Sequence, residues 1–498
     1  MLNVLLLLAL GSALGLALTF AMRSAAKRIG LVDRPDGRRK LQTRPVALAG
    51  GVAVFISTSL TLFVASLIFP EIAEPLLQNY LRILSLFAAA VVIVFVGLVD
   101  DAINLRARYK LLGQLVAVLI LVYGGGFIID QVSLLGEAIP LGYAALPVTI
   151  FWFLASINAL NLLDGMDGLL GTIAIVIVGA LAWMAFAVGN PFVGWVAVAL
   201  VGALIGFLRF NIPPATIYLG DAGSMLIGLC VGALAIGASL KGPAVAIVAP
   251  TVLLVLPILD TTAAIVRRKL TGRGLAAGDR GHLHHVLQRA GMNRGRVLAL
   301  VAALGMIAAS GALCGTLLQN DLLAAMSAAA VALILLTTGL FGTAEVRLIR
   351  ERTRAIYRSV VGRQAHVELA IRLQGSADWS EVWTRLVQAA NELNLESVRL
   401  DVNSPAWHEA FHGRWDRRTT NSSGQDHWAL EMPVLGHGQV IGRLTVAGIR
   451  AFVPFTDQLS ELCLAVMEME AAASRATLRP NAKVPIDQPT PRPMPVAS

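Results

Sequence analysis

Three groups of aspartate residues interrupt an otherwise very apolar chain. They are the adjacent pair Asp100-Asp101, the pair Asp164 and Asp167, and Asp221. Carboxylates at membrane depth are energetically costly, and they therefore mark substrate or ion sites. If the three groups lie on one side of a bilayer, they can meet in one site that binds a metal ion and handles phosphate.

The pair Asp100-Asp101 is followed by Lys110. Adjacent carboxylates raise each other's proton affinity unless a cation neutralises them. The pair therefore suits magnesium binding, or removal of a proton from an acidic nucleophile. The alternative is a structural acidic pair at a helix end, balanced by Arg106 and Arg108.

A second group places four polar side chains at intervals of three residues. They are Asn158, Asn161, Asp164 and Asp167. A continuous helix would align them as one stripe, although Gly165 and Gly168 are expected to break it. Amides and carboxylates together can bind a nucleobase or ribose and share a metal ion. Interhelical hydrogen bonding is the alternative, but four such groups in ten residues exceed what that role needs.

The segment from Asn211 to Ser224 joins two apolar stretches. Pro213 and Pro214 prevent a continuous helix there. Its glycines let the backbone approach a phosphate, and the helix that follows presents its N-terminus, which favours anions. Asp221 could hold magnesium at this point. The alternative is an ordinary turn.

A histidine-rich segment follows at His282, His284 and His285. A zinc site is disfavoured because no further histidine or cysteine lies close in the sequence. Hydrogen bonding to a diphosphate group fits these residues better. A solvated run of histidines is the alternative.

The composition predicts an all-α polytopic membrane protein, since 56% of the residues are hydrophobic and only 14% are charged. A helix needs ~20 apolar residues to cross a bilayer, and about eleven such stretches are present. Their approximate spans are 2–22, 48–69, 82–99, 111–130, 145–163, 168–188, 192–208, 223–240, 243–266, 297–318 and 322–341. The net charge of +9 arises mainly in loops between these stretches. No basic surface interleaved with aromatic residues is present, so nucleic acid is not an expected partner.

The positive charges predict the orientation. No basic residue precedes the first stretch, whereas Arg23, Lys27 and Arg28 follow it, so the N-terminus is expected outside. Alternation from there places most loop lysines and arginines inside the cell, as the positive-inside rule requires. All three aspartate groups then lie on the cytoplasmic side.

The long apolar stretches end before residue 342, and the chain is more polar after it. Residues 343–365 are expected to form a helical connector, 366–477 a small cytoplasmic α/β domain, and 478–498 a disordered Pro-rich tail. Within the domain, helices are predicted at 378–394 and 457–473, and strands at 398–402, 428–434 and 440–447. The pattern is similar to part of a GAF-type module, which implies a regulatory or interaction role. A simple scaffold is the alternative.

Taken together and in order, six segments resemble the polyprenyl-phosphate N-acetylhexosamine-1-phosphate transferase family. Within it the match is to the bacterial undecaprenyl-phosphate N-acetylglucosaminyl-1-phosphate transferase branch, of glycosyltransferase 4 type. The resemblance covers about residues 1–342. The segments are Asp33 to Lys40 with Gly50-Gly51, Asp100-Asp101 with Lys110, Asn158 to Gly168, Asn211 to Ser224, Asp260 with Arg267-Arg268, and Asp279 to His285.

The resemblance implies a phosphoryl transfer that depends on magnesium, or on manganese, at the cytoplasmic face of the bacterial inner membrane. Undecaprenyl phosphate would attack the sugar-side phosphate of a UDP-N-acetylhexosamine and release UMP. This would be the first membrane step of cell-envelope polysaccharide synthesis. The expected partners are these two substrates and membrane lipids, with a homodimer as an option. Direct attack is favoured over an enzyme-bound phosphate, because it needs only orientation and charge neutralisation.

The resemblance also implies roles for individual residues. Asp221 is the best magnesium ligand, with Asp100 and Asp101 beside it, and Asp100 is also the candidate activator of the nucleophile. The implied catalytic residues are Asp100, Asp101, Asp164, Asp167, His282, His284 and His285. The implied substrate-binding residues are Lys40, Lys110, Asn158, Asn161, Asn211, Tyr218 and Arg280. Among these, Tyr218 lies where the family often has an aromatic side chain that stacks on uracil.

The chain departs from the family pattern in its first inner loop, where Gln42 replaces a histidine. Its His-x-His-His ending favours the N-acetylglucosamine branch over phospho-N-acetylmuramoyl-pentapeptide transferases, which are the alternative within the family. A secondary transporter is the alternative from another class. It predicts sites near the midplane and two related halves, whereas here the polar motifs cluster at the inner mouth and no repeat is evident.

Overall fold

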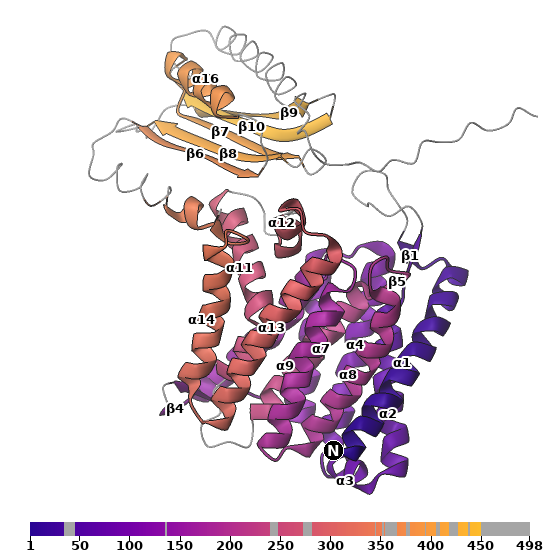
Figure 1. The fold of residues 1–498 in the computed structure, drawn as a ribbon. Coiled ribbons are helices and arrows are strands. Elements are labelled where there is room, and N and C mark those ends of the chain that lie inside the picture. The colour runs from indigo at the N-terminus through magenta and orange to yellow at the C-terminus, as the bar shows by residue number, and fades with distance from the viewer. Residues whose placement is uncertain are drawn as a thin grey trace, which may run out of the picture. The chain divides into compact units, whose positions relative to one another are not determined.

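The computed structural model describes residues 1–33, 45–134, 137–239, 248–271, 281–343, 345–350, 353, 366–374, 379–393, 395–404, 409–417, 427–436 and 439–449. The chain forms two compact units, Met1–Glu345 and Val346–Ser498. The first is a bundle of helices and the second contains an antiparallel sheet (Figure 1). The candidate residues Lys40 and Arg280 lie outside the described residues.

The first unit consists mainly of long apolar helices (Figure 1). They are α1 (Leu2–Ile29), α2 (Gly50–Ile68), α3 (Pro70–Gln78), α4 (Tyr80–Ile103), α5 (Ala107–Leu119), α6 (Ala145–Leu163), α7 (Leu169–Ala187), α8 (Pro191–Asn211), α9 (Gly220–Ser239), α10 (Val248–Leu253), α11 (Val255–Leu270), α12 (Leu283–Arg289), α13 (Arg294–Leu317) and α14 (Asp321–Thr337).

Within the described residues, nine helical segments are long and apolar enough to cross a membrane. They confirm the predicted multi-pass helical architecture. Two further predicted spans fall on shorter helices, because 243–266 corresponds to α10 and α11 and 322–341 corresponds to the 17-residue α14. The count of about eleven and the outside N-terminus stay predictions.

Close helix packing depends on small residues. A Cβ atom at Gly206 of α8 would lie 2.5 Å from the backbone nitrogen of Leu16 in α1. A Cβ atom at Gly97 of α4 would lie 2.3 Å from the Cα atom of Ala222 in α9. Because these backbones touch, α4 and α9 hold their ends in a fixed relation, and Asp100, Asp101 and Asp221 lie at those ends.

A three-stranded sheet covers one end of the bundle. It consists of β1 (Val32–Asp33), β2 (Val46–Leu48) and β5 (Ile217–Tyr218), in the order β1-β2-β5. β1 and β2 are antiparallel, and β2 and β5 are parallel. A Cβ atom at Gly51 would lie 2.2 Å from the nitrogen of Gly223, so this glycine is needed for α2 to meet the start of α9. The start of α2 thereby lies against the first turn of α9, which contains Asp221.

The predicted helix breaks are confirmed. α6 ends at Leu163 and α7 begins at Leu169. Gly168 between them has a φ of +76°, which favours glycine. α8 ends at Asn211 and α9 begins at Gly220, with the two prolines between them. Both breaks leave polar loops beside the ends of α4 and α5.

Two features of the first unit were not predicted. One is the hairpin of β3 (Gln131–Leu134) and β4 (Glu137–Pro140). The other is an apolar cavity of about 810 Å³ between α2, α3, α4, α8 and α9, whose lining contains no charged side chain. The cavity is therefore separate from the polar residues considered below.

The second unit contains a five-stranded antiparallel sheet with the order β6-β8-β7-β10-β9. Its strands are β6 (His366–Gln374), β7 (Ser397–Ser404), β8 (Glu409–Arg417), β9 (His427–Gly436) and β10 (Gln439–Ile449). Helix α16 (Trp379–Glu392) packs on one face, where Trp383 occupies the space above Gly413. The predicted first helix and three strands are confirmed, β6 and β8 were missed, and the helix predicted at 457–473 lies outside the described residues.

Candidate functional site

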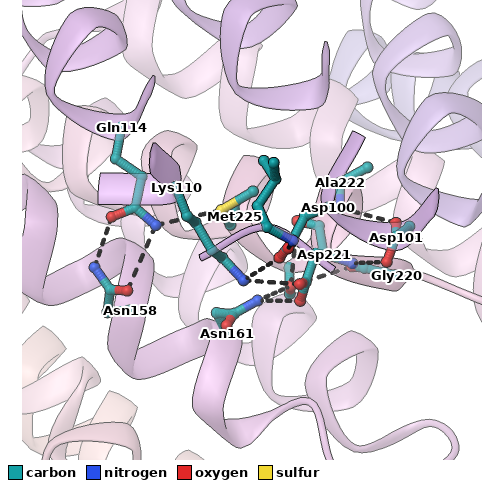
Figure 2. A network of polar contacts seen from close by, with 12 residues as sticks. Asp100, Asp101, Lys110, Gln114, Asn158, Asn161, Gly220, Asp221, Ala222 and Met225 are labelled. Atoms are coloured by element: carbon teal, nitrogen blue, oxygen red, sulfur yellow. Dashed lines mark hydrogen bonds and ion pairs between the residues drawn. The ribbon is translucent and has the colours of Figure 1, made fainter. Parts of the chain in front are cut away.

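The site is built from the ends of four helices that meet at one end of the bundle (Figure 2). α4 contributes Asp100 and Asp101 from its last turn, α5 contributes Lys110, α6 contributes Asn161, and α9 contributes Asp221 from its first turn. Residues separated by up to 121 positions in sequence are thereby brought into contact. The structure brings Asp100, Asp101 and Asp221 together, and Asp164 lies close enough to interact with the charges of Asp101 and Asp221.

Lys110 lies at the centre of this cluster. Its Nζ atom is 2.8 Å from Oδ2 of Asp100 and 2.7 Å from Oδ2 of Asp221. The other oxygen of Asp100 accepts a hydrogen bond from the Leu105 backbone N–H at 2.7 Å. Two carboxylates so close together repel each other unless a cation lies between them. Lys110 supplies that positive charge from within the protein.

Asn161 holds the remaining oxygen of Asp221. Its Nδ2 group donates to Oδ1 of Asp221 and to Oγ of Ser224, both at 2.7 Å. Asp221 is therefore fixed on both sides, by an amide and by Lys110. Asn161 was expected to bind substrate, and here its N–H groups orient the carboxylate predicted to bind metal.

Asp101 occupies a different environment from its neighbour Asp100. Its carboxylate accepts hydrogen bonds from the backbone N–H groups of Asp221 at 2.9 Å and Ala222 at 3.4 Å. These are among the N–H groups that a helix leaves unpaired at its N-terminus. Asp101 therefore caps α9. Gly220 has a φ of +69°, and a Cβ atom there would lie 2.4 Å from Oδ2 of Asp101.

Asn211 and Asp167 connect the two loops that follow α6 and α8. Oδ1 of Asn211 accepts from the Gly168 N–H at 3.0 Å, and its Nδ2 group donates to the Ile217 carbonyl at 2.9 Å. Oδ2 of Asp167 accepts from the Ala215 N–H at 3.1 Å and lies 3.2 Å from Nη1 of Arg294. Both residues thus bridge the loops that follow α6 and α8.

Asp164 differs from the other site carboxylates. Within the described part of the chain, no hydrogen bond or ion pair reaches its side chain. Burial raises the pKa of its carboxyl to about 8, and the negative charges of Asp221, Asp101 and Asp167 raise it further. An acidic group in this position favours the approach of a cation.

The three histidines have unequal surroundings. Nδ1 of His282 lies 2.8 Å from Oδ2 of Asp260, whose other oxygen accepts from the Leu283 N–H at 2.7 Å. His284 is buried, and among the described residues neither ring nitrogen has a hydrogen-bond partner. Burial, followed by the nearby His285 and His282, lowers the pKa of His284 to about 2. His284 is therefore a neutral imidazole.

His284 also connects the histidine segment to the aspartate loop. A Cβ atom at Gly165 would lie 2.6 Å from Nε2 of His284. The imidazole thus lies directly against the backbone next to Asp164. The ring centroids of His284 and His285 are 4.1 Å apart, so the two imidazoles pack against each other.

Tyr218 lies in β5, three residues before Asp221. Burial raises the pKa of its phenol to about 12, and the charges of Asp167 and Asp33 add to that effect. Tyr218 is therefore a neutral phenol at the edge of the site. Its predicted stacking on uracil stays a prediction.

Gln114 was missed from the sequence, although it shares the site with Asn158. Nδ2 of Asn158 donates to Oε1 of Gln114 at 2.8 Å. Ser224 was also missed as a partner of Asn161. A signal for Gln114 was available, because a polar residue four positions after Lys110 in an apolar helix lies on the same face.

Within the described residues, no group of three or more histidine, cysteine or acidic side chains is placed to hold a metal ion by itself. Magnesium rarely uses such an all-protein cage. It binds one or two carboxylates and keeps water and substrate phosphates as its other ligands. Asp221 and Asp164, whose charges interact, provide a donor set of that kind.

Comparison with known proteins gives a family match that includes the aspartates of the site. Residues 83–239 match the model of glycosyl transferase family 4. The chain is 31% identical over 294 residues to a probable undecaprenyl-phosphate N-acetylglucosaminyl 1-phosphate transferase of Bacillus subtilis, which covers 59% of this chain and 79% of that protein.

Two other relatives are similar over a comparable length. A decaprenyl-phosphate N-acetylglucosaminephosphotransferase of Mycobacterium tuberculosis is 31% identical over 323 residues, covering 59% of this chain and 78% of that protein. An undecaprenyl-phosphate alpha-N-acetylglucosaminyl 1-phosphate transferase of Escherichia coli K12 is 28% identical over 301 residues, covering 58% and 78%. The family match contains every aspartate of the cluster, whereas the histidines follow it.

Proposed function

The chain belongs to glycosyl transferase family 4, and on that premise we propose that it transfers N-acetylglucosamine 1-phosphate from UDP-N-acetylglucosamine to undecaprenyl phosphate and releases UMP. The proposal includes a position in the bacterial inner membrane with the site on the cytoplasmic side. It also includes a role at the first membrane step of cell-envelope polysaccharide synthesis. Membership of a transferase family leaves the transporter alternative without support.

One observation carries the proposal more than any other. Lys110 bridges Asp100 and Asp221 at the end of the bundle, Asp164 interacts with the charge of Asp221, and His284 lies against Gly165, next to Asp164. The side chains of Asp164 and His284 have no hydrogen-bonding partner among the described residues. The contacts among Lys110, Asp100, Asp221 and Asn161 fix these charged groups in position. Asp164 and His284 offer further polar atoms to the reactants, because buried polar groups otherwise find partners.

The proposed reaction forms one bond and breaks one bond at the sugar-side phosphorus. A phosphate oxygen of the lipid bonds to that phosphorus, and the bond from phosphorus to the bridging oxygen breaks. UMP leaves with the electron pair. A phosphate monoester has a second pKa near ~6, so the lipid phosphate is largely ionised at neutral pH and no proton has to be removed first. Orientation and charge neutralisation are then the main requirements.

The residues of the site suit those two requirements. Lys110 places a positive charge where the negatively charged phosphates would converge. The neutral His284 can donate one N–H to a phosphate oxygen. Asp100 holds Lys110 in place, since both of its oxygens accept hydrogen bonds. This placement supports a direct displacement without a phosphate bound to the enzyme.

We propose that magnesium binds at Asp221 and Asp164. Asp164 fits because its carboxyl lacks a partner among the described residues and lies near other negative charges. When bound there, the ion would neutralise phosphate charge. Asp100 and Asp101 were also predicted as ligands, but the hydrogen bonds of Asp101 to the start of α9 suit a structural role better.

The position of the site suits substrates of opposite character. A polyprenyl tail stays in the bilayer, whereas a charged sugar nucleotide stays in water, so the two can react only at the boundary. The aspartates lie at the ends of the apolar helices α4 and α9. The positive-inside bias supports the cytoplasmic boundary.

The proposal is tested with purified full-length protein, undecaprenyl phosphate and magnesium. UMP release is measured with UDP-N-acetylglucosamine, UDP-N-acetylgalactosamine and UDP-N-acetylmuramoyl-pentapeptide. We expect UMP from UDP-N-acetylglucosamine only when the lipid is present. Release from the muramoyl substrate alone would favour the other branch, and no release from any of the three by folded protein would refute the proposal.

Lys110→Met provides the matched variant for this assay. Its loss of charge is expected to lower the rate by about a hundredfold or more, as removal of one electrostatic contact to a transition state does. Lys27→Met, at an exposed position of α1, removes a lysine outside the cluster and should retain the wild-type rate.

A further inference from the structure

Three helices contribute two successive layers of side chains to the site (Figure 2). The layer at the mouth, here called the charged layer, contains Lys110, Asn161 and Asp221. One turn deeper lies a second layer, here called the amide layer, which contains Gln114, Asn158 and Met225. On each helix the two members are three or four positions apart, so they share a face.

Every amide N–H of the second layer is used inside the protein. Nε2 of Gln114 is 3.4 Å from Oδ1 of Asn158 and 3.3 Å from Sδ of Met225. Nδ2 of Asn158 donates to Oε1 of Gln114 and to the carbonyl of Leu154, both at 2.8 Å. Gln114 is 0% exposed. Neither amide has a donor left for a substrate.

This pairing is specific for one placement of α5. Gln114 is buried and Asn158 is partly buried between membrane helices, so an amide of Gln114 that lost its partner would have no water to replace it. A slip of α5 by one residue would move Gln114 by about 1.5 Å along the axis and about 100° around it. Such a slip would leave both amides unpaired. Buried polar pairs are known to fix helix register in this way.

The same placement decides what Lys110 can reach. Lys110 and Gln114 lie one turn apart on α5, so a shift of one moves the other. The Lys110 side chain must contact Asp100 on α4 and Asp221 on α9 together, within 2.8 Å and 2.7 Å. The lysine stem is flexible, but two simultaneous contacts constrain Nζ, so a rotation of α5 of the size given above would break at least one of them.

We propose that Gln114 and Asn158 form a positioning pair that sets the height and rotation of α5, and thereby holds Lys110 on Asp100 and Asp221. Asn158 then serves the frame of the site and does not contact the sugar nucleotide. The inference rests on the proposed transfer reaction, in which Lys110 acts on the phosphates. It assigns a role to Gln114 and replaces the expected role of Asn158.

The test compares Gln114→Met, Asn158→Leu and the double variant in the UMP-release assay, with kcat and KM for UDP-N-acetylglucosamine measured separately. We expect each single variant to lower kcat by about tenfold to a hundredfold, as a small misplacement of a catalytic group does. KM should change less than about twofold in both. The double variant should be no worse than the poorer single variant, because the two residues act as one unit.

A swapped pair, Gln114→Asn with Asn158→Gln, provides the rescue. It retains two facing amides and should recover more activity than either single variant. Thr149→Val serves as the control, since Thr149 lies elsewhere on α6 and its Oγ1 accepts a buried hydrogen bond from the Ile129 N–H. It should leave kcat unchanged. Monodispersity and thermal unfolding in detergent show whether each variant is folded.

Three results would overturn the inference. They are wild-type kcat in both single variants, additive losses in the double variant, or a raised KM in Asn158→Leu that Gln114→Met does not share. If both single variants fail to fold, the swapped variant provides the test. A swapped variant that folds but does not release UMP also contradicts the proposed positioning role. Wild-type protein without UMP release would instead refute the proposed function.

Discussion

At the scale of single residues, the site divides into groups that have partners and groups that do not. Asp100, Asp101 and Asp221 are held by Lys110, backbone N–H groups or Asn161. Within the described chain, Asp164 and His284 have no such partners. Because burial without a hydrogen bond is unfavourable, these two residues are expected to contact the reactants or the metal ion.

Asp164 predicts a pH dependence of stability in metal-free protein. Its pKa is raised from 3.8 to about 8, so the folded state retains a proton that the unfolded chain releases. The stabilisation from that proton is complete below pH 3.8 and is lost as the pH rises through about 8. Thermal unfolding in a chelator should therefore show a Tm that falls between pH 5 and pH 8 and levels off above pH 8.

Asp164→Asn should flatten that pH dependence and also lower the rate of UMP release. Magnesium should raise the Tm of the wild type at pH 8 more than that of the variant, because only the wild type offers this carboxylate. Equal pH slopes in wild type and variant would contradict the raised pKa. Equal magnesium effects would contradict the metal role.

Gly165 provides a second prediction, through its contact with His284. A Cβ atom there would lie 2.4 Å from Cε1 of the imidazole, so Gly165→Ala must displace the ring. We expect UMP release to fall by about tenfold or more. Gly179→Ala in α7 is the control, because no atom lies within 4 Å of its added Cβ. Similar rates in the two variants would show that His284 does not depend on this contact.

The sequence predicted which residues gather in the site better than what each one does. Hydropathy and loop charge place carboxylates at helix ends on one side, and the structure confirms that they meet. The hydrogen-bond partners depend on which helix faces which, and that information is absent from local spacing. Asn158 and Asn161 look equivalent in sequence, yet one pairs with Gln114 and the other with Asp221.

At the scale of elements, long apolar helices were predicted well and short elements were not. The membrane-spanning stretches exceed the length at which hydropathy is informative. β1, β2 and β5 contain only two or three residues each, and their pairing depends on distant contacts. β8 was missed because Gly413 interrupts the pattern of large apolar residues that predicts a strand. The side chain of Trp383 fills the space beside this glycine.

The prediction at the scale of elements concerns the start of α9. Gly220→Ala places a Cβ atom 2.4 Å from Oδ2 of Asp101 and adds strain at a φ of +69°. Gly189→Ala has a similar φ of +71° but no atom within 4 Å, so the strain of about 1–2 kcal/mol is common to both. Only Gly220→Ala should lose UMP release, by about tenfold or more.

The comparison of the two variants separates the effect of backbone strain from the effect of displacing Asp101, which caps α9. If Gly189→Ala loses as much activity as Gly220→Ala at matched stability, backbone strain alone explains the effect. In that case Asp101 does not position Asp221 through the N-terminus of α9.

At the scale of the whole molecule, the account depends on which side of the membrane the site faces. Single cysteines at Arg106, between α4 and α5, and at Tyr143, before α6, report on opposite ends of the bundle, and both positions are exposed. In a background without the three native cysteines, Tyr143→Cys should react with a membrane-impermeant thiol reagent in intact cells. Arg106→Cys should react only after permeabilisation. The reverse pattern would place the site outside.

The central claim is that the phosphate moves together with the sugar, and the fate of that phosphate tests it most directly. The measurement uses UDP-N-acetylglucosamine labelled at the sugar-side phosphorus, with undecaprenyl phosphate, magnesium and the full-length protein. The account predicts that the label enters the lipid fraction in step with UMP release, and that Lys110→Met slows both by about a hundredfold or more. Label that remains in water-soluble UDP while the sugar enters the lipid would contradict it.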